Sequence, residues 1–221
     1  MKKNAFTILE LIFVIIVIGI LAAVIMPRIN RDHRQEAADS ILSAIRYTQH
    51  LALNDDKTRP DGGVWQRRLW HIRFSKGNVA GTKWFYTISS NNDNNSNVDF
   101  NETAIDPSNG KRFYNAAGNY DVDPNESPDI FLTKRFGIDS IDFTGCNVPT
   151  GSSGSNAAHH IAFDQLGRPH KGVYGAANDY RTIMQGDCTI TFGFEDSGIA
   201  NLSILIHRDT GYAEIVGQSD S

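Results

Sequence analysis

Polar and apolar positions divide the N-terminal part of the chain into two unlike segments. An apolar run covers residues 6–26 (FTILELIFVIIVIGILAAVIM) and contains a single acid, Glu10. From Ala38 the apolar residues instead recur at the spacing of one helix face. The apolar face of this second segment comprises Ala38, Ile41, Leu42, Ile45 and Ala52, and the opposite polar face comprises Glu36, Asp39, Ser43, Arg46 and His50.

These two segments predict one long N-terminal helix, with a transmembrane half at 6–29 and an amphipathic half at 30–56. An apolar helix of 21 residues rises about 31 Å, which is enough to cross the hydrocarbon core of a bilayer. Pro27 predicts a kink, because it removes one backbone donor and its ring clashes with the preceding turn. Turn-forming residues at 54–56 and 60–63 predict the end of the helix.

Short aromatic and β-branched segments follow the helix and predict strands. The first two predict a hairpin, the last two are joined by a tight turn at 208–211, and the Asn-, Asp- and Gly-rich residues 91–129 predict a long surface loop. A helix followed by strands predicts an α+β fold, in which the helix packs on an antiparallel sheet of a β-rich domain at 57–221. The predicted strands are 69–74, 84–89, 138–143, 160–164, 188–194, 201–207 and 212–216.

The chain contains two cysteines, Cys146 and Cys188, and they lack the spacing of a zinc site. Both stand at the ends of predicted strands, which favours one disulfide between them. That bond would close a loop of about 43 residues and would contribute roughly 4 kcal/mol in the chain-entropy model. The alternative is two separate buried thiols.

Oxygen donors occupy every second position between residues 121 and 129. Such alternation is typical of calcium loops, although Glu126 stands where an EF-hand needs glycine and Leu132 where it needs a bidentate acid. Two interpretations remain open: a calcium site in this segment, or Asp- and Asn-rich turns with no cofactor. A second, asparagine-rich version occupies 91–102, and the donors of the main segment are Asp121, Asp123, Asn125, Ser127 and Asp129.

The N-terminus begins with a short basic leader, MKKNA, followed by Phe6, Thr-Ile-Leu and Glu10. This order resembles the N-terminus of type IV prepilins and type II secretion pseudopilins. The resemblance implies that residues 1–5 are a leader, that a prepilin peptidase cuts between Ala5 and Phe6, and that the new Phe6 amine is methylated. It also implies that Glu10 pairs with a terminal amine in the fibre. The residue before the cut is more often Gly in this family.

Two other interpretations of the apolar run are a secretory signal peptide cut near Ala22-Ala23 and a plain signal anchor. The apolar region of a signal peptide usually has about 7–15 residues and no acid, so the run favours the prepilin resemblance. Thr7-x-x-Glu10 also has the spacing of a capping box, which would give Glu10 a local role in any helix.

A second phrase, Ile161-Ala-Phe-Asp-Gln-Leu-Gly-Arg168-Pro, precedes a closing Leu-x-Ile and Thr-Gly-x-x-x-Ile. This combination resembles the H-type minor pseudopilins. An ordinary β-turn, with Gly167 at a position of positive φ, explains the same residues.

The resemblance implies a structural subunit, a pseudopilin or minor pilin, that assembles through its N-terminal helix into a periplasmic pseudopilus or pilus and drives protein secretion. Its implied location is the bacterial inner membrane, crossed once, with a periplasmic C-terminal domain. The implied partners are other pilin or pseudopilin subunits, the prepilin peptidase and the inner-membrane assembly platform.

The alternative function is a minor pilin of a DNA-uptake or adhesion type IV pilus. Basic groups such as Arg67-Arg68 are scattered and the net charge is −4, which argues against a nucleic-acid partner. A membrane-anchored enzyme is a third hypothesis, but the chain contains no G-x-S-x-G, P-loop or H-E-x-x-H motif. His159-His160 is the only adjacent histidine pair, and neighbours in a strand point to opposite faces. We therefore predict that the protein is not an enzyme.

Overall fold

The computed structural model describes the chain in several ranges. The leader, the junction between Ala5 and Phe6, and Asp121 lie outside them, as do the side chains of 22–32 and 144–145. The described ranges are 8–59, 64–77, 83–93, 98–115, 123–146, 159–174 and 180–218.

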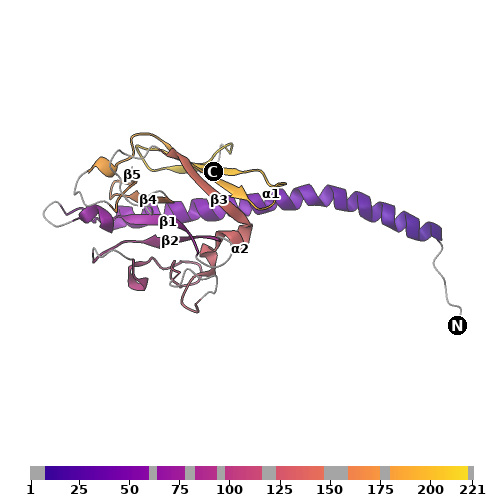
Figure 1. Ribbon diagram of the computed structural model, residues 1–221, viewed down its shortest axis with the longest axis horizontal. Coiled ribbons are helices and arrows are strands. Elements are labelled where there is room, and N and C mark those ends of the chain that lie inside the picture. The colour runs from indigo at the N-terminus through magenta and orange to yellow at the C-terminus, as the bar shows by residue number, and fades with distance from the viewer. Residues whose placement is uncertain are drawn as a thin grey trace.

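One helix, α1 (Ile8–Asn54), forms the N-terminal part of the molecule. Figure 1 shows that its first half projects away from the strands, whereas its second half lies among them. The helix ends at Asn54, as the sequence predicted. The Asn54 side-chain amide donates to the His50 carbonyl oxygen at 2.7 Å, which satisfies one of the carbonyl groups that a helix end leaves open.

Two antiparallel four-stranded sheets follow the helix, with strand orders β2-β1-β4-β5 and β3-β6-β7-β8. The first sheet consists of β1 (Trp70–Lys76), β2 (Trp84–Ser89), β4 (His160–Phe163) and β5 (Pro169–His170). The second consists of β3 (Ile138–Cys146), β6 (Cys188–Phe194), β7 (Leu202–Ile206) and β8 (Ala213–Ile215). The short helices are η1 (Trp65–Arg68), η2 (Phe100–Glu102), η3 (Pro128–Ile130), α2 (Leu132–Phe136) and η5 (Tyr180–Thr182).

The predicted strands are present, and the predicted hairpin is formed by β1 and β2. Ile72 of β1 lies opposite Ile88 of β2 on one side and Ile161 of β4 on the other. All three side chains are fully buried. Such cross-strand pairs of β-branched residues stabilise a sheet and fix its register.

The hydrophobic core lies where α1 meets both sheets. The helix packs on β1 and β4 of the first sheet and on β7 and β8 of the second. Phe74 of β1 joins the two sheets directly, because its ring centroid lies 5.6 Å from that of Phe192 on β6 and 5.9 Å from that of Phe143 on β3. One core therefore holds the helix and both sheets together.

The fold class needs a correction at the sheet, because the sequence predicted one sheet and the structure has two. The region 91–129 also differs from the predicted surface loop. Ala104 and Phe113 within it are buried, and Phe113 and Ala104 exchange backbone hydrogen bonds with Ile88 at the end of β2. Isolated apolar residues in a polar segment show no periodicity, so the pattern could not reveal this added layer.

A second correction concerns the membrane. Among the described residues, no helix is both long enough and apolar enough to cross a bilayer. The apolar stretch whose side chains are described runs from Ile8 to Leu21, a rise of about 21 Å against the roughly 30 Å of a hydrocarbon core. The predicted transmembrane half at 6–29, and with it the single-pass inner-membrane location and periplasmic domain, is therefore wrong on these residues.

Candidate assembly surface

The projecting part of α1, Ile8–Leu21, is named here the outer segment. Apart from Glu10 and Gly19, its side chains are all large and apolar, and they are all exposed, from 38 % at Val17 to 79 % at Ile8 and Leu9. Soluble proteins rarely expose a contiguous apolar surface of this size unless it binds something. Apolar residues surround the helix on every side, whereas a helix packed on a single partner needs only one apolar stripe.

Two residues of the outer segment are not large and apolar. Glu10 lies in the first turn of α1, where a carboxylate interacts favourably with the positive end of the helix dipole. Gly19 has open space around it: a Cβ built there would meet no atom within 4 Å. The segment therefore offers one acid near its start and one gap in its apolar cover.

Several predicted site residues adjoin the outer segment in sequence but lie wholly or partly outside the described part of the structure. Ala5 and Phe6 lie outside the described residues, so cleavage and methylation stay predictions. The helical backbone continues through Pro27, and the side chain of Pro27 is not described, so the predicted kink also stays a prediction.

The inner segment of α1, His33–Asn54, fixes the direction in which the outer segment projects. Its polar side chains donate hydrogen bonds to backbone oxygens in the strands and turns of both sheets. Arg34 Nε donates to the Ala200 carbonyl oxygen at 3.1 Å, and Arg46 Nη2 donates to that of Ala213 at 2.9 Å. Gln49 Nε2 donates to the carbonyl oxygens of Gly167 (3.0 Å) and Thr210 (2.7 Å). These contacts hold the helix on the domain along its inner half.

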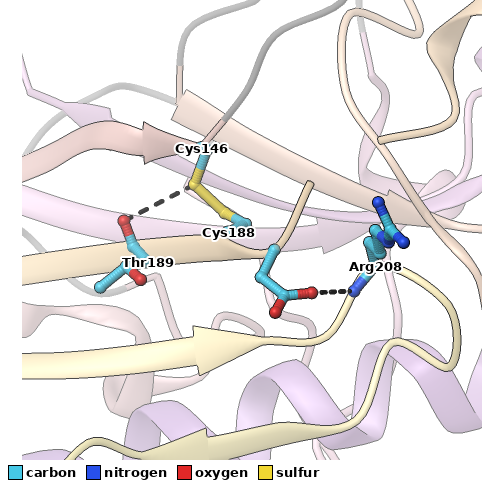
Figure 2. Close-up of a disulfide and its surroundings, with 5 residues drawn as sticks. Cys146, Cys188, Thr189 and Arg208 are labelled. Atoms are coloured by element: carbon cyan, nitrogen blue, oxygen red, sulfur yellow. Dashed lines mark hydrogen bonds between the residues drawn. A yellow bond between two sulfur atoms is a disulfide. The ribbon is translucent and has the colours of Figure 1, made fainter. Parts of the chain in front are cut away.

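The predicted disulfide between Cys146 and Cys188 is present. The two residues lie directly opposite each other at the ends of β3 and β6, and Cys146 Sγ also contacts the Thr189 carbonyl oxygen at 3.7 Å (Figure 2). Next to this bond, Asp187 Oδ1 accepts a hydrogen bond from the Arg208 backbone amide at 2.9 Å. The bond fastens β3, which is at the edge of its sheet, to the centre of the domain.

The candidate calcium segment makes protein contacts where it is described. Asp123 accepts from the Asn125 backbone amide, Ser127 donates to Asp106 Oδ2 at 2.6 Å, and Asp129 Oδ1 pairs with Arg135 at 2.7 Å. Asp121 lies outside the described residues. Within the described chain, no group of three or more histidine, cysteine or acidic side chains could hold a metal ion. Calcium therefore stays a prediction.

Asp164 shapes the turn between β4 and β5. Its Oδ1 accepts from the backbone amides of Leu166 (3.0 Å) and Arg168 (2.9 Å), and its Oδ2 pairs with the Arg168 guanidinium at 2.7 Å. Burial alone would raise the pKa of Asp164, but hydrogen bonds from His170 and Arg168 outweigh it and lower the pKa to about 2. Gly167 has a φ of 80°, as the turn interpretation of this phrase predicted.

The adjacent histidines face different surroundings, as the strand geometry predicted. His160 is buried and its Nε2 accepts from the Gly172 and Val173 amides, whereas the ring of His159 packs against those of Trp84 and Phe143. The sequence did not single out the cleft in which His159 lies. The only signal for this cleft in the sequence was the spacing of Arg73, Ser75 and Lys76 near the end of β1.

Comparison with known proteins adds no family to this picture. No protein-family model matches the sequence, and no curated protein or solved structure matches it. The resemblance to prepilins therefore remains a prediction that depends on the leader, Phe6 and Glu10.

Proposed function

We propose that the protein is a structural subunit, a pseudopilin or minor pilin, that assembles with other subunits through the outer segment of α1 into a fibre serving protein secretion. One observation carries the proposal: every described side chain of the outer segment is exposed, and all but Glu10 and Gly19 are large and apolar. A folded domain with such a projecting surface has a built-in means of association.

The energies favour association. Fully burying one large aliphatic or aromatic side chain contributes about 1.5–3 kcal/mol. The twelve large apolar side chains of the outer segment are 38–79 % exposed, so covering them could contribute on the order of 10–20 kcal/mol. The cost of lost translational and rotational freedom is about 4–15 kcal/mol. A single neighbouring helix would cover only one side of the segment. Several neighbours, as in a fibre, would cover it all round.

Glu10 has a specific role in this proposal. Removal of the leader would leave the amine of Phe6 at the N-terminus, and this amine on one subunit would pair with Glu10 of a neighbour. A carboxylate inside an apolar bundle is costly unless a cation is close to it. The pair would therefore fix the offset between neighbouring subunits, whereas the aliphatic contacts alone tolerate sliding.

Cross-linking in cells that make the protein from its own locus tests the proposal. Both native cysteines are in the disulfide, so Ile16→Cys introduces one free thiol in the outer segment. A bis-maleimide should link this variant into dimers, because the single thiol of each subunit can be joined to that of one neighbour. Ser197→Cys, at an exposed position between β6 and β7, is the matched control and should stay largely monomeric.

Adding Glu10→Gln to the Ile16→Cys variant should lower the fraction of cross-linked dimer and leave the melting temperature of the domain unchanged. Mass spectrometry of the same material should find Phe6 as a methylated N-terminus. A monomeric Ile16→Cys protein, or equal fractions of cross-linked dimer from Ile16→Cys and Ser197→Cys, would contradict assembly through the outer segment.

A further inference from the structure

A cleft of about 540 Å³ opens between the β1–β2 hairpin and β3. Arg73, Ser75 and Lys76 of β1 and Trp84 of β2 form one wall, and Ser140 and Ile141 of β3 form the other. His159, just before β4, and Phe74 of β1 complete the described lining. A concave site of this size suits a small ligand or a few residues of a peptide.

Five basic and aromatic side chains form a series of ring contacts, named here the cation–aromatic row, of which Lys76, Trp84 and His159 line the cleft, whereas Phe143 and Lys171 are buried outside its described lining. Lys76 Nζ lies 4.8 Å from the Trp84 ring centroid, and that ring meets His159 at 5.5 Å. His159 meets the Phe143 ring at 5.4 Å, and Lys171 Nζ lies 4.8 Å from the same ring. The rings hold the cationic side chains in place by cation–π attraction.

The described lining of this cleft carries cationic side chains and no carboxylate. Within the described residues, Arg73, Lys76 and Lys171 form no ion pair. Lys171 is only 1 % exposed. Burial lowers its pKa to about 8, so its ammonium is still mostly protonated at neutral pH. A partly desolvated positive charge without a counter-charge is costly, and a bound anion would offset that cost.

We propose that this cleft binds an extended, carboxylate-bearing peptide segment of a partner protein. The wall formed by β3 favours a peptide, because β3 is an edge strand that pairs only with β6 among the described strands. An extended peptide can add to such an edge through its backbone, while alternate side chains enter the adjoining cleft. The Arg73 guanidinium and the Lys76 ammonium bind carboxylates by charge-assisted hydrogen bonds.

Single-stranded nucleic acid also binds to cationic and aromatic side chains. The residues of this cleft nevertheless do not favour it. Base stacking needs an open ring face. The Trp84 and Phe143 side chains are only 4 % and 7 % exposed, so neither offers such a face. Peptide binding at the cleft is independent of the outer segment and extends the proposed function to a second surface.

Fluorescence polarisation with the full-length chain, kept soluble in a neutral detergent, tests the proposal. The probe is a labelled peptide of sequence Val-Glu-Val-Asp-Val-Glu, and the control peptide carries Gln and Asn in place of the acids. A labelled oligothymidylate forms the nucleic-acid arm. We expect the acidic peptide to bind about tenfold more tightly than its amide control, with affinity that falls as salt rises.

Two substitutions place the binding in the cleft. Lys76→Gln, at an exposed position, should weaken acidic-peptide binding about five- to tenfold. Lys134→Gln, an exposed lysine of α2 outside the cleft lining, is the matched control and should change it less than about twofold. Ser75→Glu should block the cleft with a carboxylate of its own and should not lower the melting temperature, and it should weaken binding more than Ser75→Gln, which adds similar bulk without the charge.

Equal affinity for the acidic and amide peptides would overturn the proposal, as would equal losses from Lys76→Gln and Lys134→Gln. Absence of binding at millimolar peptide would overturn it too. Stronger binding of oligothymidylate than of the acidic peptide would assign the cleft to nucleic acid instead. None of these results depends on whether the outer segment assembles, so failure here is distinguishable from failure of the proposed function.

Discussion

Along α1, the outer segment (Ile8–Leu21) leaves its described side chains in solvent, whereas the inner segment (His33–Asn54) buries one complete face against two sheets. The exposed segment is the more hydrophobic of the two. Average hydrophobicity therefore does not decide which part of this helix is buried within the molecule. The period of the apolar positions decides it, because only a one-sided stripe can pack on a flat surface and leave the other side to water.

Side-chain size sharpens this difference. The inner segment meets the sheets through small residues such as Ala37, Ala38 and Ala44 as well as through Ile41 and Ile45, and all of these are buried. Small residues let the helix axis approach both sheets closely. The outer segment is built almost entirely from Ile, Leu, Val and Phe. Such residues maximise the apolar area offered to neighbours outside the molecule.

Truncating one isoleucine in each segment gives the largest expected contrast. Ile45→Ala should lower the free energy of unfolding by about 2–5 kcal/mol, because Ile45 is fully buried and its loss leaves a cavity. Ile16→Ala, 55 % exposed, should change it by no more than about 0.5 kcal/mol. Urea unfolding of the full-length chain in detergent, followed by circular dichroism, measures both. Equal losses would show that the outer segment also packs within the monomer.

The inner segment shows what the sequence could predict. All five residues assigned to its packing face are buried, and all five assigned to its polar face are exposed. Strands such as β6 and the disulfide were also predicted, because alternation of side chains and paired strand ends are local signals. Gly167 could be assigned to a turn for the same reason.

Features that depend on contacts distant in sequence could not be predicted. The division of the strands between two sheets depends on pairings such as β1 with β4, which are about ninety residues apart. The cleft joins residues of β1, β2 and β3 with His159, and none of them carries a motif. The membrane span was predicted from hydropathy alone, which does not distinguish a surface that faces lipid from one that faces other protein chains.

Acid should weaken the packed part of the molecule through His71, which is fully buried in β1. Its Nδ1 donates to the Leu69 carbonyl oxygen at 3.0 Å and its Nε2 accepts from the Ser89 hydroxyl at 3.1 Å. Burial lowers the pKa of His71 to about 4 from 6.5. Between these values the unfolded chain binds more protons than the folded one, so stability is complete above about pH 6.5 and is lost as the pH falls toward 4.

Between pH 7 and 4.5 this loss should reach about 2–3 kcal/mol in the free energy of unfolding. The window stays above the range in which Asp164, with its pKa lowered to about 2, begins to lose its own contribution. The glutamine of His71→Gln cannot titrate. This variant should therefore lose less of its free energy of unfolding between pH 7 and 4.5, whatever stability the substitution costs at pH 7. Urea unfolding at several pH values measures it. Parallel pH profiles for the native chain and His71→Gln would show that His71 is not the group responsible.

The smallest expected effect on the monomer comes from Gly19→Ala in the outer segment. A Cβ at this position meets no atom within 4 Å, and Ala favours a helix over Gly by up to about 1 kcal/mol, so the substitution should leave the isolated chain as stable or slightly more stable. In the proposed fibre, however, a glycine would let a neighbouring helix approach closely. The fraction of cross-linked dimer from the Ile16→Cys variant should therefore fall when Gly19→Ala is added.

The same substitution in the packed region provides the control. A Cβ on Gly211 would collide with the Gly167 carbonyl oxygen and with Gln49 Nε2, and Gly211 has a φ of 67° that side chains disfavour. Gly211→Ala should therefore cost about 1–3 kcal/mol in the monomer, which thermal melting would show. If Gly19→Ala lowered the melting temperature as much as Gly211→Ala, the outer segment would have to contact the rest of its own chain. If it left both the melting temperature and the fraction of cross-linked dimer unchanged, neighbouring subunits would not pack closely at Gly19, and their contact would lie along the other sides of the helix.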